Sequence, residues 1–231
     1  MKTFAVLGTT GVSSAGTKGS TIGRGGNVGT ITANAITGKY TFKKGPAGSK
    51  QSVTQLANDA QAGIDPAIDA LQLLASEAGA INIPTTLEAY QSVHGGSIAP
   101  GTYKITSQAT DIVDKLTLDG GGDPNSVWIF VFSTTFITGV KSHVTVKHID
   151  DGSGVGLFWV ADTGATLNGK HFEGNVLAQS AITSDGGLKM CGRLLAGTAV
   201  TLYKDTIDTD CNNDGYSGSS LNKPSFTFLY Y

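Results

Sequence analysis

One stretch of the chain carries the spacing of an amphipathic helix. Between Ser52 and Ala80, apolar residues recur three or four positions apart in two successive runs. These apolar positions are Val53, Leu56, Ala57 and Ala60 in the first run and Ile68, Leu71, Leu74, Ala75 and Ala78 in the second. Asp65 and Pro66 suit the N-cap and first position of a second helix. We therefore predict helix over 51–58 or beyond and over 66–77, with a break near Gly63 and one apolar face packed against the rest of the chain.

Most of the remaining chain consists of short apolar runs separated by Gly, Asp and Asn. The clearest predicted strands are 102–106, 115–118, 127–132, 142–148 and 157–160. The glycine-rich segment 120–125 predicts a turn between two of them. Strands that are this short and numerous are typical of a sandwich, a barrel or a solenoid.

The spacing of similar segments favours the solenoid. Gly-led apolar runs begin at Gly156, Gly174 and Gly192, so the pattern recurs every 18 residues. Eighteen residues divide into three faces of about six, each a short strand and a corner. Coils of that size would stack about 4.8 Å apart through ladder hydrogen bonds. We therefore predict an all-β solenoid with a triangular section and a helix packed alongside.

A second repeated element lies within each coil. It spans 163–166, 180–183 and 198–201, with a looser version at 135–138. Strand alternation predicts that its inward residues are Ala165, Ile182, Val200 and Ile137. The outward pairs are then Gly164 and Thr166, Ala181 and Thr183, Ala199 and Thr201, and Phe136 and Thr138. Stacked coils would place these pairs in one small, mostly apolar column and one column of threonines.

The charge content makes this surface unusual. Only 15% of the residues are charged, and 16 Lys and Arg nearly balance 18 Asp and Glu. A nucleic-acid interface would need a basic patch, whereas the few Lys and Arg residues of this chain are dispersed. No apolar run is long enough to span a membrane. The charges near the repeats lie on other faces, at Lys141, His143, Lys147, Lys170, Glu173, Lys189 and Arg193. Strand propensity explains threonine on the repeated face, but it does not explain why charge is excluded there.

Several segments resemble the microbial ice-binding (antifreeze) protein family. The most specific is 116–130, LTLDGGGDPNSVWIF, and 97–105 and 158–160 are also similar. Near the start, the similar segments are 4–7, 20–23, 27–29 and 33–38, so the resemblance covers residues 1–207. It implies a right-handed, discontinuous β-helix with one long α-helix alongside. In that fold the N-terminal coil docks near the last coil.

The resemblance also implies an ice-binding face. The family's Thr-(Ala/Gly)-x-(Thr/Asn) pattern matches the repeats at 163, 180 and 198, with Ser180 in place of one Thr. The expected ice-binding residues are Thr21, Thr110, Thr138, Gly164, Thr166, Asn168, Ala181, Thr183, Ala199 and Thr201. The departures from the pattern are Phe136, Asp111, Asp185 and Tyr203, which favour moderate activity.

On this basis we expect one ice-binding domain over residues 1–231. Its parts are an N-terminal coil with loops (1–45), the helix (51–79), the β-helix coils (95–207) and a C-terminal tail or cap (208–231). The expected function is adsorption to ice, with thermal hysteresis and inhibition of ice recrystallisation. The expected partner is the ice surface, with no nucleic acid, membrane, cofactor or metal, and the chain is expected to be a monomer and not an enzyme.

The cysteines and the start of the chain suggest secretion. Cys191 and Cys211 fit one disulfide and an oxidising compartment, with two buried thiols as the alternative. The apolar run 4–7 is too short for a signal peptide, so we interpret the chain as a mature one with an added start Met. The expected location is therefore extracellular.

Three other functions are weaker interpretations of the same sequence. A β-helix polysaccharide enzyme needs clustered carboxylates, whereas Asp119 and Asp123 lie in a turn-forming segment. The four histidines, His94, His143, His148 and His171, lack metal-ligand spacing. A calcium loop at 208–219 lacks the required Gly and Glu positions. An extracellular carbohydrate-binding or adhesive module, the main alternative, would favour exposed aromatic residues in a groove.

Overall fold

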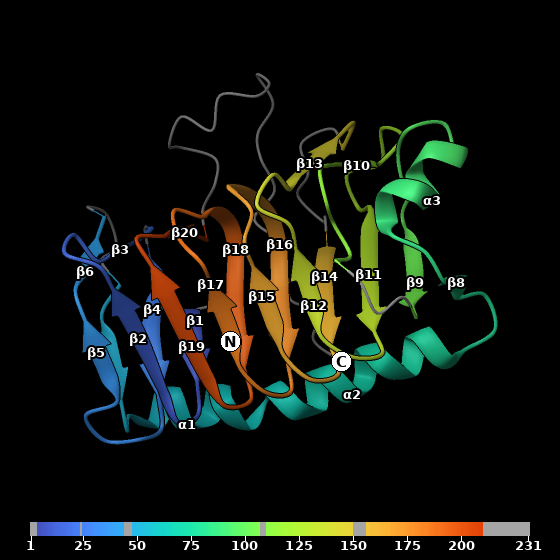
Figure 1. Ribbon diagram of the computed structural model, residues 1–231. Coiled ribbons are helices and arrows are strands. Elements are labelled where there is room, and N and C mark those ends of the chain that lie inside the picture. Colours follow the sequence, from blue (N-terminus) through green and yellow to red (C-terminus); the bar gives the residue numbers. More distant parts are fainter. Residues whose placement is uncertain (1–3, 24, 44–47, 107–109, 150–155, 210–231) are drawn as a thin grey trace.

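The computed structural model describes residues 4–23, 25–43, 48–106, 110–149 and 156–209. Two sheets run side by side, and every named strand pair within them is parallel. Sheet B contains β12 (Phe136–Thr138), β15 (Ala165–Leu167), β17 (Ile182–Ser184), β19 (Ala199–Tyr203), β2 (Gly11–Ala15) and β5 (Ile36–Gly38), in that order. Figure 1 shows these six strands as one layer. The parallel pairing excludes an antiparallel sandwich, which the short strands of the sequence also allowed.

Sheet A is the larger sheet and has fourteen strands within the described residues. Its main path is β6 (Tyr40–Phe42), β3 (Ser20–Ile22), β20 (Thr206–Asp208), β18 (Lys189–Ala196), β16 (His171–Ala178), β14 (Gly156–Ala161), β11 (Val127–Phe132), β9 (Gly101–Ile105) and β8 (Ile81–Ile83). The remaining members are β1 (Phe4–Gly8), β4 (Asn27–Thr30), β7 (Lys50–Ser52), β10 (Lys115–Asp119) and β13 (His143–Lys147). Each of the five strands that we predicted from the sequence is present, within one residue at either end.

Strands from the start of the chain pair with strands after residue 188 in both sheets. In sheet A, β1 pairs with β18 on one side and β4 on the other. In sheet B, β2 pairs with β19 and then with β5. In each sheet, an N-terminal strand therefore lies between a strand from late in the described chain and another N-terminal strand.

The predicted 18-residue repeat is confirmed between β16 and β18, whereas the repeat between β14 and β16 is one residue shorter. Gly174 pairs with Gly192, as the 18-residue period requires. Phe158 pairs with Asn175, so Gly156 lies one position out of register with Gly174. A loop that is one residue shorter accounts for the shift, because corners absorb such changes without disturbing the strands.

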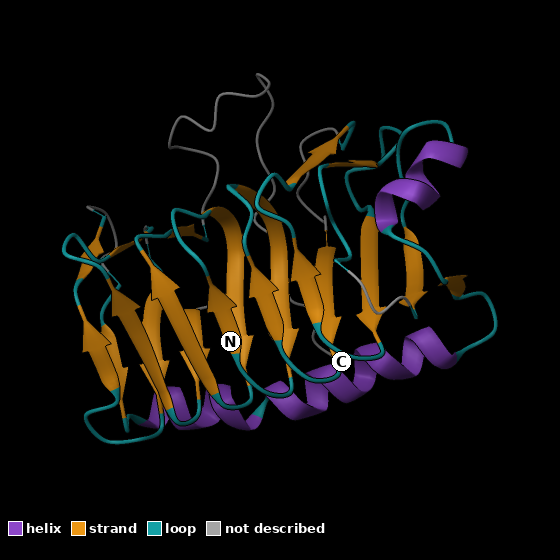
Figure 2. Cartoon of the chain, viewed as in Figure 1, coloured by secondary structure: helices purple, strands orange, loops and turns teal. Residues whose placement is uncertain are grey.

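The helical region lies along the outside of the strands (Figure 2) and consists of α1 (Gln55–Ala62) and α2 (Ile64–Ser76). The expected break at Gly63 is confirmed, because Gly63 separates the two segments. Two boundaries differ from the prediction. The hydroxyl of Thr54 accepts a hydrogen bond from the Ala57 backbone at 3.2 Å, so α1 begins at Gln55 rather than at position 51.

The second boundary concerns α2, which begins at Ile64 instead of Pro66. Asp65 lies in its first turn rather than at its N-cap. The helical face that packs on sheet A consists of Ala57, Ala60, Ile64, Ile68, Leu71 and Ala75. It contacts the sheet residues Phe4, Leu7, Ile129, Val131, Phe158, Val160, Leu177 and Leu195. Val53 and Leu56, which we expected on this face, are exposed: Val53 precedes α1, and Leu56 lies in its first turn beside the buried face of Ala57 and Ala60.

A third helix, α3 (Leu87–Val93), was not predicted. It covers the edge of β10 that does not pair with β13, where Ile98 forms only an isolated bridge with Leu118. The side-chain oxygen of Gln91 accepts a hydrogen bond from the backbone N–H of Thr117 at 2.6 Å, and its amide donates to the Lys115 carbonyl at 3.2 Å. One glutamine thus satisfies two backbone groups of an edge strand.

Stacked aromatic rings fill the interior between the sheets. Phe130 stacks on Trp159 with ring centroids 4.5 Å apart, and Tyr103 continues the stack at 5.1 Å from Phe130. Phe136 stacks on the same tryptophan at 5.4 Å. These rings are at most 2% exposed, so the sheets rest on a rigid core.

Candidate functional site

Backbone pairing in sheet B places one outward residue of each strand in a single line. The members of this threonine column are, in order, Ile137, Thr166, Thr183, Thr201, Ser13 and Thr37. For the first five, both strand neighbours are buried, so these side chains point away from the core. Thr37 pairs directly with Ser13, so it faces the same side of the sheet. Thr183, Thr201 and Thr37 are exposed, while the other three are half-buried.

A second line of small residues runs parallel to the first. The members of this small-residue column are Thr135, Gly164, Ala181, Ala199, Gly11 and Ala35. A methyl group added at Gly164 would lie 2.9 Å from the carbonyl oxygen of Ala181, and one at Gly11 equally close to that of Ala35. The neighbouring backbone therefore requires glycine at these two positions.

A row of hydroxyl side chains borders the small-residue column at the corner of the coils. The backbone N–H of Ser180 donates to the backbone carbonyl of Thr163 at 2.7 Å, and that of Thr10 donates to the carbonyl of Thr198 at 2.9 Å, so these residues are aligned across the strands. The hydroxyls of Thr135 and Thr163 lie 2.8 Å apart. The face therefore presents hydroxyls and methyls at spacings of about 4.8 Å between strands and about 6.7 Å along a strand.

Charge is absent from the strands of this face. None of the residues in β2, β5, β12, β15, β17 and β19 is Asp, Glu, Lys or Arg. The exclusion of charge that we inferred from the sequence is thus confirmed for sheet B. Two of the charges expected on other faces are instead buried in sheet A, Glu173 at 2% and Arg193 at 6% exposure. Arg193 donates to the side-chain oxygen of Asn175 at 3.2 Å, and burial lowers its pKa to about 10.

Six of the ten expected site residues lie in the two columns. They are Gly164, Thr166, Ala181, Thr183, Ala199 and Thr201. Asn168 follows β15 at the margin, where its side-chain amide donates to the Thr138 carbonyl at 2.8 Å.

Three expected site residues lie elsewhere. Thr138 is fully buried, because the strand alternation at β12 is opposite to our prediction. Phe136 is likewise in the core, and Ile137 takes the outward position, so Phe136 does not roughen the face. Thr21 belongs to β3 in sheet A. Thr110 lies outside the column, because Asp111 is the residue whose backbone N–H reaches the Ile137 carbonyl, at 2.8 Å.

The sequence prediction missed the N-terminal part of the face. Gly11, Ser13, Ala35 and Thr37 extend the two columns through β2 and β5. A signal was present, because Thr10–Ser13 reads TGVS and Asn34–Thr37 reads NAIT. Both segments fit the same four-residue pattern as the later repeats, with conservative replacements.

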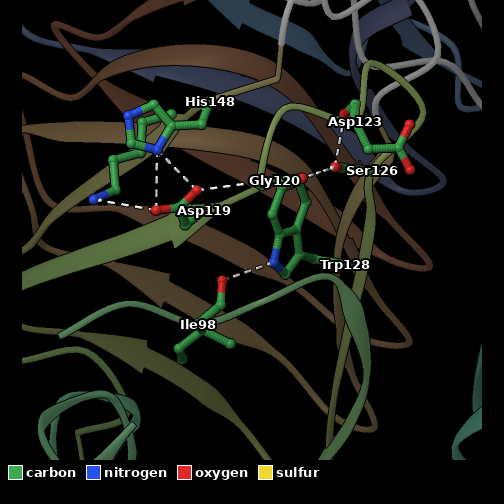
Figure 3. Close-up of polar contacts among 9 residues, drawn as sticks. Ile98, Asp119, Gly120, Asp123, Ser126, Trp128 and His148 are labelled. Atoms are coloured by element: carbon green, nitrogen blue, oxygen red, sulfur yellow. Dashed lines mark hydrogen bonds and ion pairs between the residues drawn. The ribbon is translucent and has the colours of Figure 1, made fainter. Parts of the chain in front are cut away.

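The two carboxylates considered for catalysis hold turns. Asp119 accepts a hydrogen bond from the backbone of Gly121 at 3.0 Å, and Asp123 accepts one from Asn125 at 2.8 Å. Figure 3 shows Asp119 facing His148, whose ring nitrogen lies 3.0 Å from a carboxylate oxygen. These contacts give both carboxylates the turn-forming role that the glycine-rich segment predicted.

Ionisation of the Asp119 carboxyl makes a pH-dependent contribution to the stability of the fold. Burial opposes ionisation, but hydrogen bonds from Gly121, His148 and Lys147 outweigh it and hold the pKa below its usual value. A depressed carboxyl pKa stabilises the fold above the unfolded-state value of about 4, and this stability is lost on further acidification. We therefore expect the melting-temperature difference between the native chain and Asp119→Asn to narrow as the pH falls from about 6 to about 2. A constant difference would contradict this account.

The structure gives the histidines packing partners. His143 and His171 stack with ring centroids 4.3 Å apart, and His94 stacks on Tyr90 at 3.9 Å. Among the described residues, no group of three or more His, Cys, Asp or Glu could hold a metal ion. The part of the chain that the structure describes also contains no helix long and apolar enough to cross a membrane.

Two predictions fall outside the described residues. Cys191 is buried in β18, whereas Cys211 is not described, so their disulfide stays a prediction. The expected tail or cap at 208–231 and the suggested calcium loop lie outside the described part from residue 210 onward; Asp208 ends β20 and pairs with Lys43 at 3.4 Å.

Comparison with known proteins identifies the family that this fold and face define. The model of the Ice-binding-like family matches residues 6–208, and the chain belongs to that family. An ice-binding protein of Nostoc sp. (strain HG1) is 34% identical over 120 residues, and one of Flavobacterium frigoris (strain PS1) is 32% identical over 117. These matches cover 51% and 50% of this chain but only 43% and 41% of those relatives.

Solved structures agree over more of the chain. The crystal structure of an ice-binding protein from the Antarctic ascomycete Antarctomyces psychrotrophicus aligns with a TM-score of 0.73 and 31% identity. That alignment covers 90% of this chain and 94% of the other. An ice-binding protein domain from Shewanella frigidimarina aligns with a TM-score of 0.69 at 21% identity, covering 90% and 94% of the two chains, which supports the fold.

Proposed function

We propose that this protein adsorbs to ice crystals through the outer surface of sheet B, causing thermal hysteresis and inhibiting recrystallisation. The observation that carries the proposal is the charge-free pair of columns, with Thr166, Thr183 and Thr201 beside Gly164, Ala181 and Ala199. Membership of the Ice-binding-like family and the ice-binding function named for its relatives support it.

The proposed mechanism is adsorption through ordered water. Threonine hydroxyls anchor water molecules, and the methyl groups and small residues between them confine those waters at regular spacings. Holding each ordered water costs up to about 2 kcal/mol, so the scaffold must not lose further entropy when it meets ice. The stacked aromatic core and the helix along sheet A supply that rigidity.

We further infer that the sheets form faces of a right-handed, triangular and discontinuous β-helix. The placement of β1 beside β18 and of β2 beside β19 supports the discontinuity. The protein would act as an extracellular monomer that binds no nucleic acid or membrane and catalyses no reaction.

Nanolitre osmometry of the full chain tests the proposal. A single ice crystal held just below its melting point should become faceted and stop growing in the presence of the protein. An equal molar concentration of serum albumin provides the control. Ice that grows as a rounded disc at high concentration of the folded protein would contradict the proposed function.

A further inference from the structure

Tyr203 places an aromatic ring directly beside the threonine column. It follows Thr201 by two positions on β19, so both side chains point to the same side of sheet B. The side chain is 40% exposed, and its partner on β2 is the small residue Ala15. The equivalent position after β17 is the exposed Asp185, two residues after Thr183, so the ring lies between a carboxylate and a small residue.

Two glycines on the neighbouring strands make room for the ring. Gly186 follows β17 and Gly16 follows β2, the two strands that pair with β19. A methyl group added at Gly186 would lie 2.6 Å from Cδ1 of the ring, and one at Gly16 would lie 3.5 Å from Cε2. The ring therefore extends toward both neighbouring strands, at the level where their side chains would begin.

The backbone on either side holds this tyrosine in place. Its N–H donates to the buried carboxylate of Asp205 at 2.8 Å, and its carbonyl accepts from the N–H of Gly187 at 2.9 Å. Lys204 adopts a left-handed conformation with φ of 58°, and its ammonium lies 4.8 Å from the ring centroid. The position of the ring is thus fixed by several independent contacts.

We propose that Tyr203 sets the width of the ice-contacting surface; this inference rests on the proposed function. The ring takes the position beside Thr201 where a further hydroxyl and methyl would extend the threonine column toward Ala15 on β2. Ring carbons cannot hydrogen-bond to water as a threonine hydroxyl does, and the single phenol hydroxyl stands beyond the ring, so the ordered water layer ends at Tyr203. Tyr203 is therefore a residue that limits how much of sheet B engages ice.

The substitution Tyr203→Thr tests this inference. It removes the ring and adds a hydroxyl and a methyl in line with Thr201, so thermal hysteresis should rise at equal molar concentration. Tyr203→Phe keeps the ring and should leave hysteresis unchanged. Leu73→Thr is the matched control, because it removes an exposed apolar side chain from α2, away from sheet B.

Each outcome separates this inference from the proposed function. Folding is checked by circular dichroism, and Tyr203→Ala serves as the second ring-deletion variant if Tyr203→Thr does not fold. A folded ring-deletion variant with unchanged or reduced hysteresis would overturn the inference. If the native chain still causes hysteresis in that case, the proposed function stands. A native chain without hysteresis would overturn both.

Discussion

Replacing Thr183 by tyrosine is expected to remove most of the thermal hysteresis and leave the fold intact. Thr183 lies in the middle of the threonine column, between Thr166 and Thr201, and its side chain is exposed. A tyrosine ring would stand above the flat surface and hold the adjacent threonines away from the ice. Because no buried contact is lost, the free energy of unfolding should change by about 0.5 kcal/mol or less.

The measurement compares hysteresis with thermal melting in the same samples. Thr41→Tyr is the matched control, since Thr41 is an exposed threonine on β6 in sheet A. This control variant should retain full activity. Equal losses in both variants, or full activity in Thr183→Tyr, would show that sheet B is not the adsorbing surface.

A methyl group at Gly192 is expected to cause a large loss of stability. Gly192 has a φ of 146°, and an added Cβ would lie 1.9 Å from the carbonyl oxygen of Gly174 on the paired strand. The strained backbone costs about 1–3 kcal/mol and the overpacking another 1–3. Gly192→Ala should therefore lose about 4 kcal/mol, a large part of the 5–15 kcal/mol that stabilises a typical domain.

Chemical denaturation measures this loss directly. Gly95→Ala is the control, because Gly95 also has a positive φ, of 75°, but an added methyl would meet nothing within 4 Å. That variant should lose only the strain energy, about 1–2 kcal/mol. If Gly192→Ala were no less stable than Gly95→Ala, the close approach of β16 and β18 would be wrong.

Patterns of period and alternation predicted the parts of the structure that depend on local physics. The strands, the helix break at Gly63 and the outward direction of Thr166, Thr183 and Thr201 follow from residue spacing. The start of α1 differed because a single hydroxyl, that of Thr54, caps the helix. A cap is a local contact that the apolar spacing does not include.

The inward or outward direction of side chains could not be predicted from the sequence at every strand. At β12, residues 135–138 fit either alternation, and the interior chooses between them, because Phe136 stacks on Trp159. Packing of that ring turns Ile137 outward and Thr138 inward, and no sequence pattern contains this information. Similarly, Gln91 replaces a strand partner of β10, a role that only the folded neighbours define.

The meeting of the two chain halves in sheet B has a consequence for folding. The hydroxyl of Ser13 donates to that of Thr201 at 3.4 Å, although 188 residues separate them. Contacts between residues so distant in sequence form late and slow the search for the native state. During synthesis, β2 and β5 leave the ribosome well before β19, the strand that pairs with β2. Sheet B is therefore continuous only after β19 has been made and has paired with β2.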